Sequence, residues 1–308
     1  MDLSAISWTL LLASLMVAAT PILMAAIGEL VVERAGVLNL GVEGMMITGA
    51  IAGFAGAVTT GSPALGFLGA ALAGALLSMT FGVLTQFLMS NQVATGLALT
   101  LFGLGLSALL GQGYIGIKAP PTYDLDLGPL ADIPVLGPVL FDHDPWVYLG
   151  LAVVAGVWWM LRFTRAGLIL RAVGESAEAA HALGYRVRTV RLLAIAFGGA
   201  MAGMGGAYLS LVRVPQWTEG MTAGAGWIAL AIVVFASWRP WRLLAGAYLF
   251  GGITVLQLNL QAAGLAVPAW ALSMSPYVIT IVVLVLISTG RRGTAAPAAL
   301  GKPFHAST

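Results

Sequence analysis

The sequence predicts an all-α integral membrane protein, a polytopic bundle of about nine transmembrane helices. From Gly44 to Ile117 the chain contains no Asp, Glu, Lys or Arg, whereas a single membrane-spanning helix needs only about 20 mostly apolar residues. Over the whole chain 8% of the residues are charged, against about 25% in an ordinary soluble domain. Both observations exclude a soluble catalytic domain and point to work done in or across a membrane.

Charge-free runs place the individual helices, with breakers such as Gly61-Ser62-Pro63, Asn91-Gln92 and Pro268 between them. The expected spans cover residues 6–28, 36–59, 64–89, 93–113, 145–161, 191–212, 221–238, 242–262 and 271–289. A tenth short span would also fit. These helices form one transmembrane domain over residues 1–290, and we expect the Ala- and Pro-rich tail, 291–308, to be poorly ordered.

The basic residues give the orientation, since Lys and Arg accumulate in cytoplasmic loops. With the N-terminus outside, every Lys and Arg except Lys118 and Arg213 falls on the inside. The loop over 113–144, which is rich in Asp, is then external, while the 162–191 loop and the C-terminus are cytoplasmic. A re-entrant segment or a tenth span would alter only the side of the N-terminus.

Polar residues border the first and second spans. Glu33-Arg34 fits a cytoplasmic turn, and Asn39 and Glu43, four residues apart, should share one face of the second helix. A carboxylate at membrane depth is costly and usually faces the bundle interior or a wet cavity. Two interpretations of Glu43 remain open: a polar site on a solute path, or a structural acid that pairs with an Arg or a helix N-terminus.

The 162–191 loop contains a short Ala-rich segment. Residues Glu175 to Leu183 predict a helix that ends at Gly184 as its C-cap. Small surface side chains would let such a helix dock into a groove of a partner. Alternatively, it lies on the membrane while nearby Arg side chains contact lipid phosphates.

Glycine spacing predicts how the helices pack, and the motifs that are missing exclude several classes of function. The patterns Gly49-x-x-x-Gly53 and Gly199-x-x-x-Gly203 predict close helix approach. There is no P-loop motif, so this chain does not bind ATP through one. Cys is absent and the His residues lie in loops or the tail, so neither a metal site nor a nucleophile–base pair at membrane depth is expected.

Several motifs carry a family resemblance, in order along nearly the whole chain. They are Glu33-Arg34-Ala35-Gly36-Val37-Leu38-Asn39-Leu40-Gly41-Val42-Glu43-Gly44-Met45-Met46, Asn91-Gln92-Val93-Ala94-Thr95-Gly96-Leu97-Ala98-Leu99, Arg171-Ala172-Val173-Gly174-Glu175, Gly205-Gly206-Ala207-Tyr208-Leu209-Ser210 and Glu219-Gly220-Met221-Thr222-Ala223-Gly224. The chain resembles membrane subunits of bacterial ABC importers in the branched-chain amino acid, ribose and nucleoside permease superfamily, most of all the shorter permease of nucleoside importers.

The resemblance implies a bacterial inner-membrane complex. It would contain a second, different permease subunit and two cytoplasmic ATPases, which hold ATP and Mg. An extracytoplasmic binding protein would deliver the solute to the 113–144 loop and the 213–221 segment. No nucleic-acid partner is implied. The segment from Gly174 to Gly184 becomes the coupling helix that contacts an ATPase, with Gly174, Glu175, Ala179, Ala180 and Gly184 as its coupling residues.

The implied function is inward movement of nucleosides or related purine and pyrimidine solutes by alternating access. Candidate path residues are Asn39, Glu43, Asn91 and Gln92. A simple-sugar or branched-chain amino acid permease would have the same architecture. An ion-coupled carrier is an alternative from another class, although intramembrane acids are nearly absent; an intramembrane enzyme is a third.

Overall fold

A computed structural model describes residues 8–123, 136–262 and 296–305, with a few isolated residues in the stretches between them. Within this part of the chain the protein is helical, and its only strand-like contacts are the isolated bridges Ile115–Trp217 and Lys118–Gln216. The all-α fold class predicted from composition is therefore confirmed for the described residues.

Seven of the described helices are long and apolar enough to cross a membrane. They are α1 (Trp8–Arg34), α2 (Val42–Thr60), α3 (Pro63–Gln86), α4 (Gln92–Gly111), α5 (Pro145–Phe163), α8 (Val187–Tyr208) and α10 (Pro240–Ala262). Three shorter helices are α6 (Arg165–Glu175), α7 (Ala177–Ala182) and α9 (Ala225–Phe235). The last expected span, 271–289, lies outside the described residues, apart from isolated positions.

Local sequence signals set several helix starts. Pro63 and Pro145 occupy the first turns of α3 and α5, where the missing N–H of proline costs no helical hydrogen bond. The side chains of Asn91 and Asp144 accept hydrogen bonds from the first free amides of α4 and α5. These breakers and caps explain why the expected boundaries near these four residues agree with the structure.

The connection between α1 and α2 corrects one prediction. The second helix begins at Val42 rather than at residue 36, so Asn39 and Glu43 do not share a helix face. Gly36 has a φ of +82°, which ends α1. The Asn39 side chain then accepts a hydrogen bond from Gly41 N at 2.9 Å, a local turn that competes with helix. Glu33-Arg34, expected in the turn, instead ends α1.

Helix α8 packs against α1, α2 and α3 through glycines. A Cβ at Gly203 would overlap backbone atoms of α3, and one at Gly206 would overlap the Met46 carbonyl oxygen of α2. A Cβ at Gly49 would likewise overlap Gly203. The close helix approach predicted from the Gly-x-x-x-Gly patterns is therefore confirmed, because glycine allows backbones to touch without intervening side chains.

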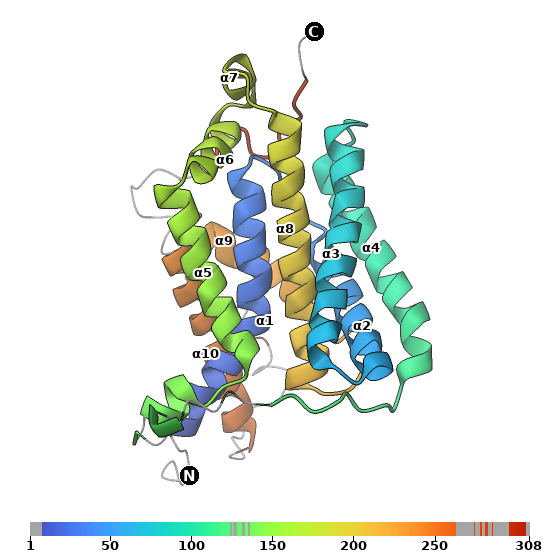
Figure 1. The fold of residues 1–308 in the computed structure, drawn as a ribbon, viewed down its shortest axis with the longest axis vertical. Coiled ribbons are helices and arrows are strands. Elements are labelled where there is room, and N and C mark those ends of the chain that lie inside the picture. The colour runs from blue at the N-terminus through green and yellow to red at the C-terminus, as the bar shows by residue number, and fades with distance from the viewer. Residues whose placement is uncertain are drawn as a thin grey trace.

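The two ends of the bundle differ (Figure 1). Helices α6 and α7 and residues 296–305 lie at one end, and the start of α1 lies at the other. The expectation of a poorly ordered tail is wrong for 296–305. Ala299 N donates to Gly174 O at 2.9 Å, and the Phe304 side chain is buried among residues of α6, α7 and α8. The tail residue Phe304 supplies apolar surface that this small helical unit buries.

Candidate functional site

The segment between α8 and α10 joins the two ends of the bundle without a continuous helix. Trp217 pairs with Ile115 near the end of α4, whereas Trp238 lies beside Arg34 at the opposite end. Irregular residues 214–224, which include Trp217, precede the 11-residue α9 (Ala225–Phe235). The predicted helical span over 221–238 is therefore wrong as one continuous helix, since only 225–235 are helical. Irregular backbone at membrane depth is tolerated where it is buried in protein or lines a cavity.

Glu43 holds the start of this short helix. Its Oε1 accepts hydrogen bonds from Thr222 Oγ1 at 2.6 Å and Gly224 N at 2.9 Å, and its Oε2 accepts one from Gly226 N at 2.7 Å. The side chain is 3% exposed. A carboxylate at a helix N-terminus satisfies free amides and complements the helix dipole. Of the two interpretations left open by the sequence, this geometry matches the acid paired with a helix N-terminus.

The far end of α9 is held by the last turn of α1. Trp238 Nε1 donates to Glu33 Oε2, while the guanidinium of Arg34 donates to Trp238 O at 2.8 and 3.2 Å. Trp238 has a φ of +54°, an unfavourable backbone conformation for a bulky residue, and these contacts hold it. Acidic groups of α2 and α1 thus fix both ends of α9.

A cavity of about 390 Å³ lies beside the irregular segment. Its walls come from α1, residues 209–228 and α10, and its polar lining includes Thr218, Thr222 and Thr254. Because Thr222 also donates to Glu43, the buried carboxylate is one hydrogen bond from the cavity wall. This volume lies in the range of about 300–1,000 Å³ that is usual for small-molecule sites.

A second cavity, of about 600 Å³, lies toward the end that carries the start of α1. The two cavities share Ala18 and Arg213 in their walls, and Arg213 donates to Ala18 O at 3.4 Å. The two cavities therefore adjoin at the Arg213 side chain, and Thr222 lies in the wall of the inner one.

The other predicted path residues lie elsewhere, where the α1–α2 connection meets α4. Gln92 Oε1 accepts from Leu38 N at 2.8 Å, and its Nε2 is buried without a partner among the described residues. Asn39 N donates to Glu29, which is also buried and was not singled out from the sequence. Asn91 is exposed and caps α4. Of the four candidates, Glu43 alone bonds to a residue of the 390 Å³ cavity.

Sequence reasoning missed Thr222 as a site residue. The available signal was the pair Gly220 and Gly224 inside an apolar run, and both have positive φ in the structure. Glycines at left-handed positions indicate a turn rather than a helix. If Gly220 and Gly224 are interpreted as turn residues, the sequence predicts an irregular segment between them, where Thr222 lies.

The segment proposed for coupling is divided between two helices. Gly174 and Glu175 end α6, and Gly174 packs against the Arg34 carbonyl. Ser176 breaks the helix by accepting Ala179 N with its side chain, so the predicted continuous helix from Glu175 to Leu183 is wrong, and only Ala177–Ala182 follow as α7.

The faces of α7 differ in exposure. Ala180 is buried, and Ala179 is exposed. Leu183, which sequence reasoning did not select, is 75% exposed. Gly184 follows with a φ of +87°, a conformation that suits glycine at the C-terminus of a helix. An apolar side chain therefore protrudes at the tip of the unit.

A polytopic helical bundle with a broken crossing, a half-length helix at a buried carboxylate and adjoining cavities has the architecture of a membrane transport protein. The chain belongs to the branched-chain amino acid transport system/permease component family, whose model matches residues 11–287. It is accordingly an ABC transporter permease, a transport component rather than an enzyme, and the resemblance read from its motifs is confirmed.

Relatives named for different solutes are similar over nearly the whole chain. A putative glucose ABC transporter permease of Haloferax volcanii is 42% identical, over 94% of this chain and 95% of its own length. A nucleoside ABC transporter permease of Lactococcus lactis is 33% identical, over 90% and 92%. A guanosine ABC transporter permease of Bacillus subtilis is 31% identical, over 94% of both chains.

Proposed function

We propose that this chain is a membrane subunit of an ATP-driven importer for solutes that contain a sugar ring, with nucleosides as the first class. The observation that carries the proposal is full-length similarity to the nucleoside and guanosine permeases. Simple sugars are the second candidate, because the relative named for glucose has higher identity. A ribose or hexose ring offers hydroxyl groups to the threonines of the cavity wall.

In this proposal the solute moves through the two adjoining cavities and past the short helix α9. The contacts of Glu43 with Thr222, Gly224 and Gly226 fix α9 to α2, so that motion of α2 is carried to the cavity wall. Asn39, Asn91 and Gln92 border the path farther along, where the α1–α2 connection meets α4. A binding protein has already selected the solute, so weak binding suffices and release stays fast.

The end that carries α6, α7 and residues 296–305 faces the cytoplasm of a bacterial inner membrane. Arg34, Arg162, Arg171 and Arg239 gather in one pocket at this end, and Lys302 belongs to the 296–305 segment there, which agrees with the positive-inside rule. There α7 contacts an ATPase that holds ATP and Mg. A second permease subunit and an extracytoplasmic binding protein complete the complex.

The coupling assignment is tested at Ala179. An Ala179→Trp substitution places a large ring on the exposed face of α7, whereas Ala180, on the buried face, must stay intact. We expect uptake and ATP hydrolysis to lose their mutual dependence while the melting temperature of the purified subunit is unchanged. If ATP hydrolysis by the variant complex still depends normally on solute, the proposal that α7 contacts the ATPase is wrong.

The solute class is tested by uptake of labelled guanosine, uridine, glucose, ribose and leucine in cells with the gene deleted and restored. The proposal predicts loss of nucleoside uptake, which the restored gene recovers. Loss of glucose or ribose uptake alone would assign simple sugars as the solute class and leave the proposed mechanism unchanged. Loss of leucine uptake alone would contradict the sugar-ring proposal.

A further inference from the structure

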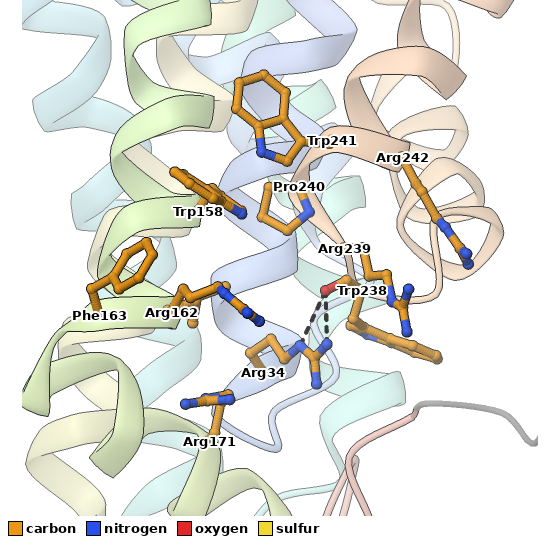
Figure 2. A pocket seen from close by; sticks show the side chains of 11 residues that line it. Arg34, Trp158, Arg162, Phe163, Arg171, Trp238, Arg239, Pro240, Trp241 and Arg242 are labelled. Atoms are coloured by element: carbon orange, nitrogen blue, oxygen red, sulfur yellow. Dashed lines mark hydrogen bonds between the residues drawn. The ribbon is translucent and has the colours of Figure 1, made fainter.

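An arginine-rich pocket lies at the α6–α7 end of the bundle, away from the cavities beside α9. It has a volume of about 730 Å³ and is bounded by the ends of α1 and α5, by α6 and by the turn between α9 and α10. Five guanidinium groups line it, with tryptophan rings around them (Figure 2). The five are Arg34, Arg162, Arg171, Arg239 and Arg242.

The charges of this pocket are not balanced from within. Among the described residues that line it, none is Asp or Glu. Outside the lining, Glu175 interacts electrostatically with Arg34 but is exposed at the end of α6, so one carboxylate faces five guanidinium groups. Nearby Glu33 already accepts a hydrogen bond from Trp238 Nε1, and Arg34 is committed in part to Trp238 O. Like charges that share one partly enclosed space repel each other. Such an arrangement favours an anion, and the planar guanidinium fork suits phosphate oxygens in particular.

The pocket lies where membrane-spanning helices end. Helix α1 ends at Arg34, α5 ends at Phe163 and α10 begins at Pro240. The rings of Trp158 and Trp241 pack with centroids 5.9 Å apart, and Trp241 is 48% exposed. Tryptophan is typical of the boundary between hydrocarbon and water. The guanidinium groups therefore lie at the level of lipid headgroups.

We propose that this pocket binds the headgroup phosphate of an anionic phospholipid, such as phosphatidylglycerol or cardiolipin. Basic pockets between transmembrane helices are suited to such headgroups. The bound phosphate neutralises the arginines, and the Trp158–Trp241 wall contacts the glycerol and upper acyl region. Since Trp238 and Arg239 end the α9 segment, the lipid also braces the turn between α9 and α10.

The test uses the purified full-length protein in nanodiscs or detergent and measures retained phosphatidylglycerol by native mass spectrometry, with phosphatidylcholine as the neutral comparison. The double variant Arg162→Gln/Arg239→Gln removes two exposed charges from opposite walls of the pocket. The matched control, Arg165→Gln/Arg186→Gln, removes two exposed charges at the same end but outside the lining.

We expect the pocket variant to weaken phosphatidylglycerol binding roughly 30-fold, since each surface arginine contributes about 1 kcal/mol toward anionic lipid. The control should retain binding. Equal losses in both variants, or equal retention of phosphatidylcholine and phosphatidylglycerol by the unmodified protein, would overturn the proposal. Displacement of the lipid by millimolar inorganic phosphate would reassign the pocket to a soluble anion.

Discussion

At the scale of single residues, Glu43 organises the centre of the molecule. It lies in the first turn of α2, yet its three hydrogen bonds go to the segment that starts α9, about 180 residues further along the chain. The sequence could indicate that a buried acid there needs partners, because an unpaired charge at that depth is too costly. It could not name Thr222, Gly224 and Gly226, since nothing local links the two segments.

A Glu43→Gln substitution replaces one acceptor oxygen with an amide group that must face an N–H or O–H donor. We expect a loss of about 1–3 kcal/mol of stability. Thr222→Val should cost less, because it removes one donor and leaves the carboxylate two amides. A double-mutant cycle on melting of the purified protein measures their coupling, and additive effects would contradict the bond between the two side chains.

At the scale of helices, α8 depends on glycine at its contacts. Gly206 faces the backbone of α2, while Gly105 on α4 has no atom within 4 Å of the position a Cβ would take. The sequence pattern predicted close packing of α8, but partner helices became evident only in the fold. A larger side chain should therefore be accepted at Gly105 and should disrupt packing at Gly206.

Gly206→Ala should destabilise the protein by about 1–3 kcal/mol or more, since the Met46 carbonyl belongs to the backbone and cannot rotate away. Gly105→Ala should be neutral or stabilise by up to about 1 kcal/mol through the better helix propensity of alanine. Thermal unfolding in one detergent compares them. Similar melting temperatures for the two variants would refute the close contact between α8 and α2.

The C-terminal segment ties the α6–α7 unit to the bundle. Besides the Phe304 contacts, buried Arg191 of α8 donates to Lys302 O at 3.2 Å, to Ala35 O at 3.2 Å and to Gln86 Oε1 at 3.3 Å. One guanidinium thus joins the tail to α3 and to Ala35, the residue that follows α1. Composition predicted poor order for this tail because it is rich in Ala and Pro. One Phe among these residues changes the average hydrophobicity little, and the sequence does not show that this ring is buried.

Phe304→Ala should release this tie. Loss of the buried ring costs about 3 kcal/mol, which we expect to appear as faster amide hydrogen exchange in α7 with little change in α2 or α3. His305→Ala, which alters an exposed neighbour, is the control. Unchanged exchange in α7 would mean that the tail does not hold this unit in place.

At the scale of the whole molecule, hydropathy predicted the helical class, and turn residues predicted most helix boundaries. Hydropathy failed over 221–238, where it predicted one continuous helix and the structure has a turn, the short helix α9 and a second turn. An apolar segment folded in this way has the same hydropathy as a continuous span. The candidate path was only partly predictable for the same reason. Glu43 stood out as an acid in an apolar run, whereas the threonines of the cavity wall have no individual signal in the sequence.

The central claim is that this subunit moves its solute at the expense of ATP hydrolysed on partner chains. The most direct measurement is uptake into proteoliposomes that contain the gently purified complex and its binding protein, energised with either ATP or an ion gradient. The account predicts a co-purifying ATPase and uptake that requires ATP alone. Uptake by this chain without any ATPase, driven by a proton or sodium gradient, would contradict it.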